Sequence, residues 1–211
     1  MMYNKTLLFL QKYYLVKKAI SVNKKNSIKL HTLLRASKIR IKGKENSIEL
    51  KNGSFKRMKI TIEGNNNLIT IDKDVVAKNI EIIIRGSNHT FTIGSGTEVG
   101  GASVVLCGEN SKIEIGKNCL LASGISFKSC DGHAIYHNSK VINNSKSITI
   151  SDNVWIAQDV TFLKGAGVGR DSVVGMNSLV LSQVDETNII LAGSPAKILK
   201  RDITWGKEAT L

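Results

Sequence analysis

The sequence predicts an all-β fold, a parallel β-helix in which the chain winds through stacked triangular coils. Three observations lead to this prediction. Glycines recur every 21 or 22 residues in the first half of the chain, and apolar residues recur every six residues in the second half. A single proline and 18 glycines among 211 residues do not fit a disordered chain. The repeats decide the fold class, because a fixed period of roughly 20 to 50 residues is the signature of a solenoid.

Four segments of the first half share one pattern, an alternating strand that ends in glycine, a polar turn, and a second short alternating strand. The segment Ile41-Lys42-Gly43, for example, leads to Ile48 and Leu50. Its counterparts start at Ile62, Ile84 and Leu106, and the glycines of the four turns are Gly43, Gly64, Gly86 and Gly108.

In the second half the apolar period is six, which an α-helix with its 3.6-residue turn cannot keep on one face. Three such hexads make an 18-residue triangular coil, and a period of 21 or 22 is the same coil with a small excursion. Stacked coils would bury continuous aliphatic columns while the backbones of successive coils pair. The inward residues are expected to be Ile150, Ile156, Phe162, Val168, Val174 and Val180.

The remaining segments complete the expected domain organisation. Residues 1–22 contain the apolar run Leu7-Leu8-Phe9-Leu10 and are expected to form a short amphipathic helix. The run is too short to cross a bilayer and no small-residue cleavage site follows, so neither an integral membrane segment nor a signal peptide is expected. Residues 23–205 are assigned to the β-helix and residues 206–211 to a C-terminal tail.

The net charge of +13 is concentrated at one end of the chain. Residues 1–44 hold twelve Lys or Arg and no acidic residue, so the rest holds 30 − 12 = 18 basic and 17 acidic residues. Such a field would concentrate a polyanion, whether nucleic acid, an acidic membrane or an acidic polysaccharide. A solvated basic face that only maintains solubility is an equally good interpretation.

The cysteines indicate a reducing compartment. Cys107, Cys119 and Cys130 are odd in number and have no CxxC spacing, so neither a disulfide framework nor a zinc site is expected. We therefore expect a cytoplasmic protein, and association with the inner membrane surface stays open.

Motifs of the second half resemble those of hexapeptide-repeat acyltransferases. The likeness begins at Ile150-Ser151-Asp152-Asn153-Val154-Trp155-Ile156-Ala157 and continues through Phe162-Leu163-Lys164-Gly165 and 168–175. It ends at Ala192-Gly193-Ser194-Pro195-Ala196-Lys197, similar to the glycine-x-proline-alanine-lysine ending of that family. Together the motifs span roughly residues 110–205, in order and at the family's spacing.

This resemblance implies acetyl-CoA-dependent O-acetylation on a left-handed β-helix, and a homotrimer with sites between neighbouring subunits. Two shorter segments, Asp131-Gly132-His133-Ala134-Ile135 and Ile203-Thr204-Trp205, resemble capsular polysaccharide and sialic-acid O-acetyltransferases. At Ser182-Gln183 the chain departs from a common threonine-lysine pair, which removes one positive charge expected near the cofactor.

Acyl transfer to a hydroxyl needs a base, and His133 is the candidate. The hexad phase places an inward aliphatic at position 133, yet histidine stands there and the register fails until Ile148. A loop of that length suggests function. His137, in the same loop, is the second choice, whereas His89 occupies a turn of a repeat and is expected to be structural. Asp131 or a backbone carbonyl could orient the imidazole.

Trp155 precedes an inward aliphatic and should point outward, where its indole N–H could donate to the acetyl oxygen or the acceptor. Packing between subunits would explain it almost as well. Small residues give the pantetheine arm of the cofactor room, and basic residues near the C-terminus suit its phosphates, although a solvated tail is the alternative. The expected cofactor contacts are Trp155, Ala157, Lys164, Gly175, Ser182, Gly193, Pro195, Lys197, Lys200 and Arg201.

Three functions remain open on the sequence. The first is O-acetylation of an acidic surface or capsular polysaccharide, with acetyl-CoA and the glycan as partners. The second is O-acetylation of a small sugar or another small alcohol, and the third is a non-catalytic β-helix that binds a polyanion. Four scattered histidines do not suit a metal-dependent enzyme of this fold, so no metal is expected. No nucleic-acid-binding module accompanies the charge.

Overall fold

The computed structural model describes residues 20–21 and 25–208, and all regular structure in these residues is β. Of the segment 1–22 expected to be helical, only Ile20–Ser21 are described, and they form a strand, β1. The rest of that expected helix, and the end of the expected tail, lie outside the described residues. Within the described residues, no helix has the length and apolar character needed to cross a membrane.

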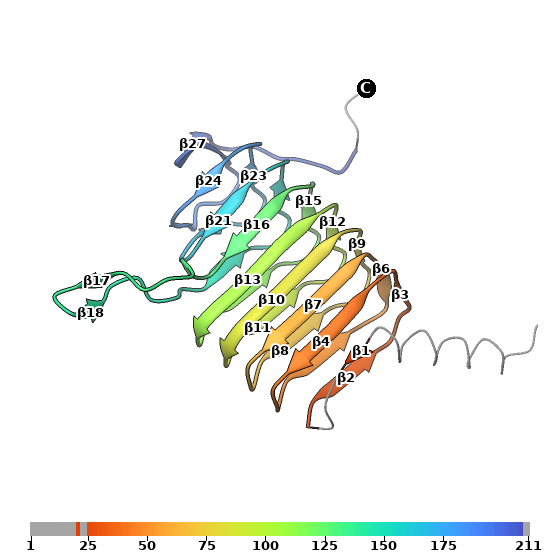
Figure 1. The fold of residues 1–211 in the computed structure, drawn as a ribbon. Helices are drawn as coiled ribbons and strands as arrows, with labels where there is room; N and C mark the ends of the chain where they lie inside the picture. The colour runs from red at the N-terminus through yellow and green to blue at the C-terminus, as the bar shows by residue number, and fades with distance from the viewer. Residues whose placement is uncertain (1–19, 22–24, 209–211) are drawn as a thin grey trace, which may run out of the picture.

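The strands form three long parallel sheets that wrap around one axis (Figure 1). Sheet A contains β1, β4 (Lys38–Lys42), β7 (Met58–Glu63), β10 (Ile80–Ser87), β13 (Ala102–Glu109), β16 (Ile125–Lys128), β21 (Thr161–Leu163) and β24 (Leu179–Val180). Sheet B contains β2 (Ser27–Leu30), β5 (Ser47–Leu50), β8 (Leu68–Ile71), β11 (Thr90–Ile93), β14 (Lys112–Ile115), β19 (Ile148–Ile150), β22 (Gly167–Val168) and β25 (Gln183–Val184). Sheet C contains β3 (Leu34–Arg35), β6 (Gly53–Lys56), β9 (Val75–Ala77), β12 (Glu98–Val99), β15 (Leu120–Leu121), β20 (Trp155–Ile156), β23 (Val173–Val174), β26 (Ile190–Gly193) and the antiparallel β27 (Ala196–Lys200).

The pairing register confirms both predicted periods. In the first half Lys42 pairs with Glu63 and Ile84 with Leu106, offsets of 21 and 22 residues. In the second half Phe162 pairs with Val180, an offset of 18 residues. The predicted triangular coil is therefore correct, and every coil passes from sheet A to sheet B to sheet C. The edge between sheets A and B is called the A/B corner, and the edge between sheets C and A is called the C/A corner.

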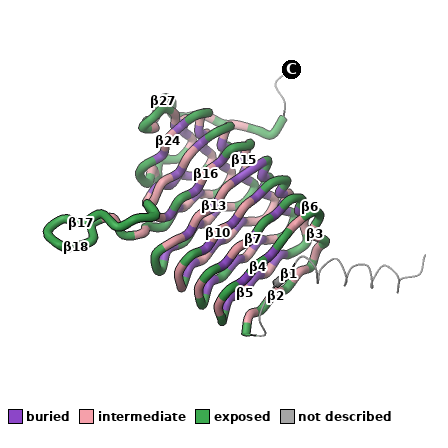
Figure 2. Tube along the Cα trace, viewed as in Figure 1, coloured by how far each residue is buried: buried purple, intermediate pink, exposed green. Residues whose placement is uncertain are grey.

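Aliphatic and aromatic columns fill the inside of the prism, as predicted from the hexads. Figure 2 shows buried positions alternating with exposed ones along the coils. The rings of Phe127 and Phe162 stack at a centroid distance of 5.0 Å on neighbouring coils. Each fully buried large side chain contributes about 1.5–3 kcal/mol, so the core, not turn chemistry, supplies most of the stability. The residues predicted to point inward, Ile150, Ile156, Phe162, Val168, Val174 and Val180, are all buried.

A ladder of buried polar side chains runs along the inside of the A/B corner. In three successive coils it contains Asn46, Asn67 and His89, followed by Ser111 and Ser129. The Nδ1 atom of His89 lies 2.9 Å from the Ser111 hydroxyl, which in turn lies 2.9 Å from the Ser129 hydroxyl. His89 is therefore structural, as expected from its place in the repeat.

One long loop interrupts the solenoid. Ile115 pairs with Ile150, an offset of 35 residues, because the chain leaves the A/B corner after Ser129 and returns at β19. The loop carries a small antiparallel hairpin of β17 (Tyr136–His137) and β18 (Lys140–Val141), which stands away from the prism in Figure 1. The register break predicted around position 133 is confirmed, and the excursion spans residues 130–147.

Candidate functional site

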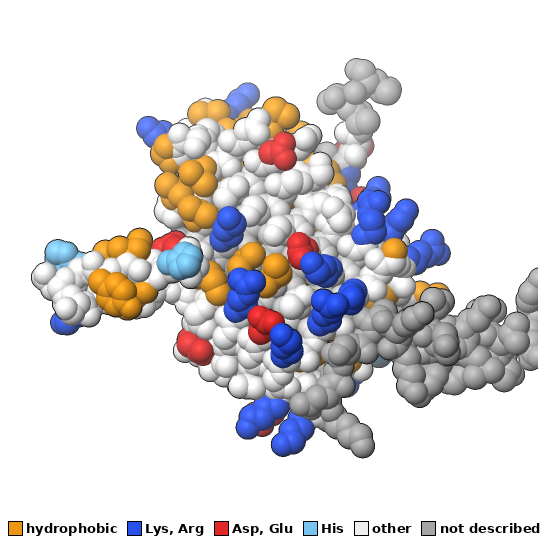
Figure 3. Space-filling model, in the orientation of Figure 1, with side chains coloured by type: hydrophobic (Ala, Val, Ile, Leu, Met, Phe, Trp, Pro, Cys, Tyr) orange, Lys and Arg blue, Asp and Glu red, His pale blue; other side chains and the backbone are white. Residues whose placement is uncertain are grey.

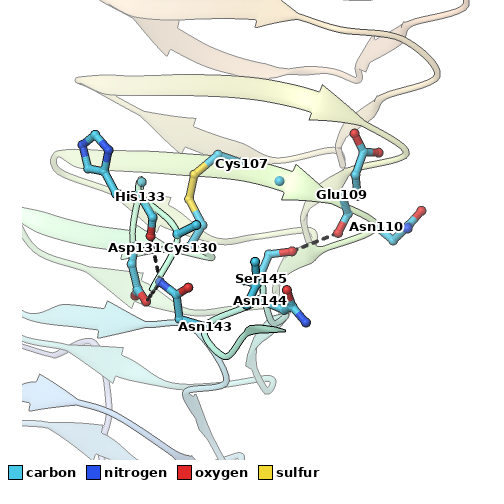
Figure 4. Close-up of a pocket in the computed structure, with 13 residues that line it drawn as sticks. Cys107, Glu109, Asn110, Cys130, Asp131, His133, Asn143, Asn144 and Ser145 are labelled. Carbon is cyan, nitrogen blue, oxygen red and sulfur yellow. Dashed lines mark hydrogen bonds between the residues drawn. A yellow bond between two sulfur atoms is a disulfide. The ribbon is translucent and has the colours of Figure 1, made fainter. Parts of the chain in front are cut away.

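The base of the 130–147 loop encloses an open cavity of about 510 Å³ at the A/B corner (Figure 4). His133 lines this cavity and is exposed. Its imidazole ring points away from the side chains of Asp131 and Asn143. His137, the alternative base, lies in the hairpin that stands off the prism.

A hydrogen-bond network holds the loop around His133. The side-chain amide of Asn143 donates to the Asp131 carboxylate and to the backbone carbonyl of His133, both at 2.8 Å. Lys164, just after β21, donates to the same carboxylate and, at 3.0 Å, to the carbonyl of Asn143. The Lys164 ammonium and then the Asn143 amide hold the pKa of Asp131 below its usual value. Asp131 thus fixes the loop backbone rather than the imidazole ring.

A disulfide between Cys107 and Cys130 ties the loop to β13, with the two Cα atoms 5.7 Å apart. The expectation that the chain has no disulfide is therefore wrong. Sequence spacing could not reveal this bond, since the two cysteines are separated by 23 residues and meet only because one coil brings Cys130 beside Cys107. Cys119 is the free cysteine of the described residues and is buried.

A second feature lies at the C/A corner, where small residues occupy the same position in five successive coils. The backbone N–H of each of the first four donates to the next coil, so the five stack directly. A Cβ atom added at Gly175 would lie 2.7 Å from the Cβ of Ala192, which shows how closely successive coils approach there. We call this set the small-residue floor, and its members are Gly100, Ala122, Ala157, Gly175 and Ala192.

Trp155 borders the floor from sheet C. It immediately precedes Ile156 and Ala157, points outward as predicted, and keeps 39% of its surface exposed. Its ring lies 6.2 Å from that of Trp205, whose indole N–H donates to the carbonyl of Asn153. The C-terminal segment that resembled sialic-acid O-acetyltransferases is thus packed beside Trp155, a contact that the sequence did not predict.

The C-terminal hairpin closes one end of the floor. Strands β26 and β27 are joined through Gly193 and Pro195, and Lys197 pairs with Ala192, so Lys197 lies at the end of the floor. Lys197 and Lys200 are exposed and make no ion pair within the described residues. Arg201 differs, because its guanidinium is bound to Glu186 at 2.6 Å.

The predicted site residues therefore divide between two corners. His133, Lys164 and Ser182 lie at the A/B corner, where Ser182 follows Lys164 by one coil. The residues expected to hold the pantetheine arm, Ala157 and Gly175, lie at the C/A corner. Within one chain, sheet A separates the proposed base from the floor.

The geometry defines a parallel β-solenoid of hexapeptide repeats with one protruding loop, and comparisons with known proteins agree. No protein-family model matches the chain. A polysialic acid O-acetyltransferase of Escherichia coli O1:K1 / APEC is 34% identical over 94 residues, 44% of this chain. The match spans only 30% of the length of that relative.

Two solved structures are similar over nearly the whole chain. The polysialic acid O-acetyltransferase OatWY has 30% sequence identity and a TM-score of 0.81, covering 88% of this chain and 90% of that one. The polySia specific acetyltransferase NeuO has 26% identity and a TM-score of 0.76, covering 92% of this chain and 85% of that one. The chain belongs to the hexapeptide-repeat acetyltransferase family, as the resemblance of its motifs predicted.

Proposed function

We propose that this protein is an acetyl-CoA-dependent O-acetyltransferase that modifies a hydroxyl of an acidic surface or capsular polysaccharide. The observation that carries the proposal is the 30% identity to a polysialic acid O-acetyltransferase over 88% of the chain. The basic first coils add support, since an acidic acceptor would be drawn to them. The family resemblance also leads us to propose a left-handed coil.

In the proposed reaction His133 acts as general base. Its imidazole takes the proton of the acceptor hydroxyl as that oxygen attacks the thioester carbonyl carbon of acetyl-CoA. The C–O bond forms, the C–S bond breaks, and the thiolate of CoA leaves with the proton from the imidazolium. The indole N–H of Trp155 is proposed to donate to the carbonyl oxygen while it carries negative charge.

The small-residue floor fits the acyl donor. The pantetheine arm is a narrow chain, and a row without side chains beyond Cβ lets it lie directly against the strand backbones. At the end of the floor Lys197 and Lys200 carry free positive charge for the phosphates. Arg201 fits less well, because a phosphate would have to compete with Glu186 for the guanidinium.

We further propose that the active unit is a homotrimer. His133 and the floor occupy different corners of one prism, and direct transfer needs the base within hydrogen-bond reach of the acceptor hydroxyl. A neighbouring subunit that places its 130–147 loop against the C/A corner would complete the site. The exposed apolar residues of the hairpin, which would lie against that neighbour, are Ile135, Tyr136, Val141 and Ile142.

The test is release of CoA thiol from acetyl-CoA, measured on polysialic acid with wild type, His133→Ala and His137→Ala. Removal of a general base should lower kcat by about 10²–10⁴-fold in His133→Ala. His137→Ala is the matched control, a histidine of the same loop, and should keep the wild-type rate. An unchanged rate in His133→Ala would disprove the assignment of the base, and the absence of any glycan-dependent thiol release in wild type would disprove the function.

A further inference from the structure

The C/A corner continues beyond the small-residue floor toward the N-terminus, and there it is basic. Arg35 pairs with Lys56, and the same register brings Lys78 to this position in the next coil and Gly100 in the one after. Arg57 stands one residue further along its coil, with its N–H bound to the carbonyl of Arg35. One edge of the prism thus carries cations in its first coils and the floor in its last.

These four cations have no charged partner among the described residues. None of Arg35, Lys56, Arg57 and Lys78 makes an ion pair or a side-chain hydrogen bond there, and all four are exposed. Of the carboxylates nearby, Asp159 lies against Gly124, at the far side from Arg57, and two others are paired with lysines. Glu81 binds Lys59 at 2.5 Å, and Glu98 binds Lys207 at 2.9 Å. The corner therefore presents four uncompensated positive charges, and Figure 3 shows Lys and Arg gathering at the edge where β3, β6 and β9 end.

Two cavities lie where the cations give way to the floor. One of about 500 Å³ has Arg57 at its N-terminal side and Asn79 beside it, and its wall includes the hydroxyls of Ser103, Ser123 and Ser126. The other, of about 230 Å³, is lined by Lys78 and by Ala122 of the floor. Both include Gly100, so they adjoin each other.

We propose that this corner is the acceptor track, along which an anionic polysaccharide lies against Arg35, Lys56, Arg57 and Lys78. The cavity beside Arg57 holds one acidic sugar of the polymer, with its carboxylate on the guanidinium and its hydroxyls on the serines. The inference rests on the proposed function, which it deepens by placing the acceptor on one edge and in one direction.

The lining of the cavity favours a glycan over a nucleic acid. Single-stranded nucleic acids are held by aromatic side chains on which the bases stack. No Phe, Tyr, Trp or His lines either of these two cavities, whereas hydroxyl, amide and guanidinium groups do, and the one carboxylate in each, Glu81 or Glu98, is paired with a lysine. Those groups suit the hydroxyls and the carboxylate of an acidic sugar.

The placement also gives the polymer a direction. Corresponding positions in four successive coils are held by Arg57, Asn79, Gly101 and Ser123. Because successive coils lie about 4.8 Å apart, about 14 Å separates Arg57 from Ser123. The next coil holds Ala157 of the floor. The acceptor would thus approach the site of transfer from the N-terminal coils and the acyl donor from the C-terminal end. A monomer held beside Ala157 lies three coils, about 14 Å, from Lys78 and further from Lys56 and Arg57, so only longer chains reach these cations.

The experiment compares binding of fluorescently labelled polysialic acid, by anisotropy and without acetyl-CoA, to wild type and two triple variants. K56Q/R57Q/K78Q removes three cations of the track, and K29Q/K112Q/K117Q removes three exposed, unpaired cations elsewhere, on sheet B and just after it. The track variant should bind about tenfold more weakly, because each exposed charge contact contributes a factor of a few. The control should bind within about twofold of wild type.

The readouts separate this inference from the proposed function. Acetyl transfer to a sialic acid monomer should fall less in the track variant than its transfer to polysialic acid does, and His133→Ala should bind the polymer as tightly as wild type does. Equal weakening in both triple variants, or tighter binding of an oligothymidylate than of polysialic acid, would overturn the track while leaving transfer to the monomer intact. Thermal unfolding of each variant near the wild-type Tm checks that the coils are folded.

Discussion

The buried polar ladder at the A/B corner yields a prediction whose size follows from individual hydrogen bonds. In the His89→Leu variant the side chain keeps a similar volume but loses both ring nitrogens. The Nε2 atom of His89 lies 3.1 Å from the carbonyl of Gly108, and Nδ1 lies 3.3 Å from the backbone N–H of Ser111. The N–H of the buried Ser111 would be left without this partner, and the carbonyl of Gly108, which lies at the exposed end of the corner, would lose its partner as well.

Each buried polar group without a partner costs about 1–3 kcal/mol, so His89→Leu should lower the free energy of unfolding by about 2–4 kcal/mol. The hydroxyl of Ser111 adds little to this loss, since it still reaches Ser129. His89→Asn is the matched control, because the previous coil uses asparagine at this position. There the Asn67 amide donates to the carbonyl of Gly86 at 3.0 Å and its oxygen accepts the next backbone N–H at 2.9 Å.

The assay is thermal unfolding followed by circular dichroism for wild type, His89→Asn and His89→Leu. For a chain of this size, about 2–4 °C of Tm corresponds to 1 kcal/mol, so His89→Leu should unfold on the order of 10 °C below wild type. The Tm of His89→Asn should fall by less than half as much as that of His89→Leu. Equal Tm values for the two variants would refute the argument, because a side chain that can restore the hydrogen bonds would then stabilise the position no better than one that cannot.

Two further predictions concern the reactivity of the cysteine thiols and the stability of the 130–147 loop at low pH. Burial raises the pKa of the Cys119 thiol to about 11. At about pH 8 the native protein should therefore not react with a thiol reagent. Unfolding should expose one reactive thiol, and reduction of the unfolded chain should raise the number of reactive thiols to three. More than one thiol in the unfolded, unreduced chain would contradict the disulfide. Lys164 and the amide of Asn143 lower the pKa of Asp131 in the folded state, so the loop anchor is intact above the unfolded value of 3.8 and lost as the pH falls through the lower folded value. Pepsin should therefore cut the loop faster in wild type as the pH falls from about 4 to 2, and cutting of Asp131→Asn should not show this acid step.

Much of the fold could be predicted because the repeat itself encodes it. An apolar residue every six positions, as at Ile156, Phe162 and Val168, is compatible with few backbones other than a triangular coil, and burial confirms each of these positions. Gly64 was recognised from its repeat alone, and the structure gives the reason. It adopts a φ of +153° and packs so closely on Gly86 that a Cβ atom would overlap the carbonyl of that residue.

The candidate site was only partly predictable. His133 was identified by its departure from the hexad phase, which is a property of the sequence. The residues that hold the loop around His133 could not be identified in this way, because Asn143 and Lys164 reach Asp131 from 12 and 33 residues away and no periodic pattern marks them. Lys164 was assigned to the cofactor on resemblance alone, and its ammonium lies within the loop network.

The amino-acid sequence by itself determined the coil, its period, the inward columns and the place where the chain leaves them, because these depend on local spacing and on burial of apolar side chains. The tertiary structure decided which residues share a corner. Cys107 meets Cys130, the floor stacks, and the four cations continue the same edge only because pairing brings together residues 18 to 23 positions apart, or 35 across the long loop. Long-range juxtaposition of this kind depends on the exact register between coils, which a difference of one residue in any turn would change.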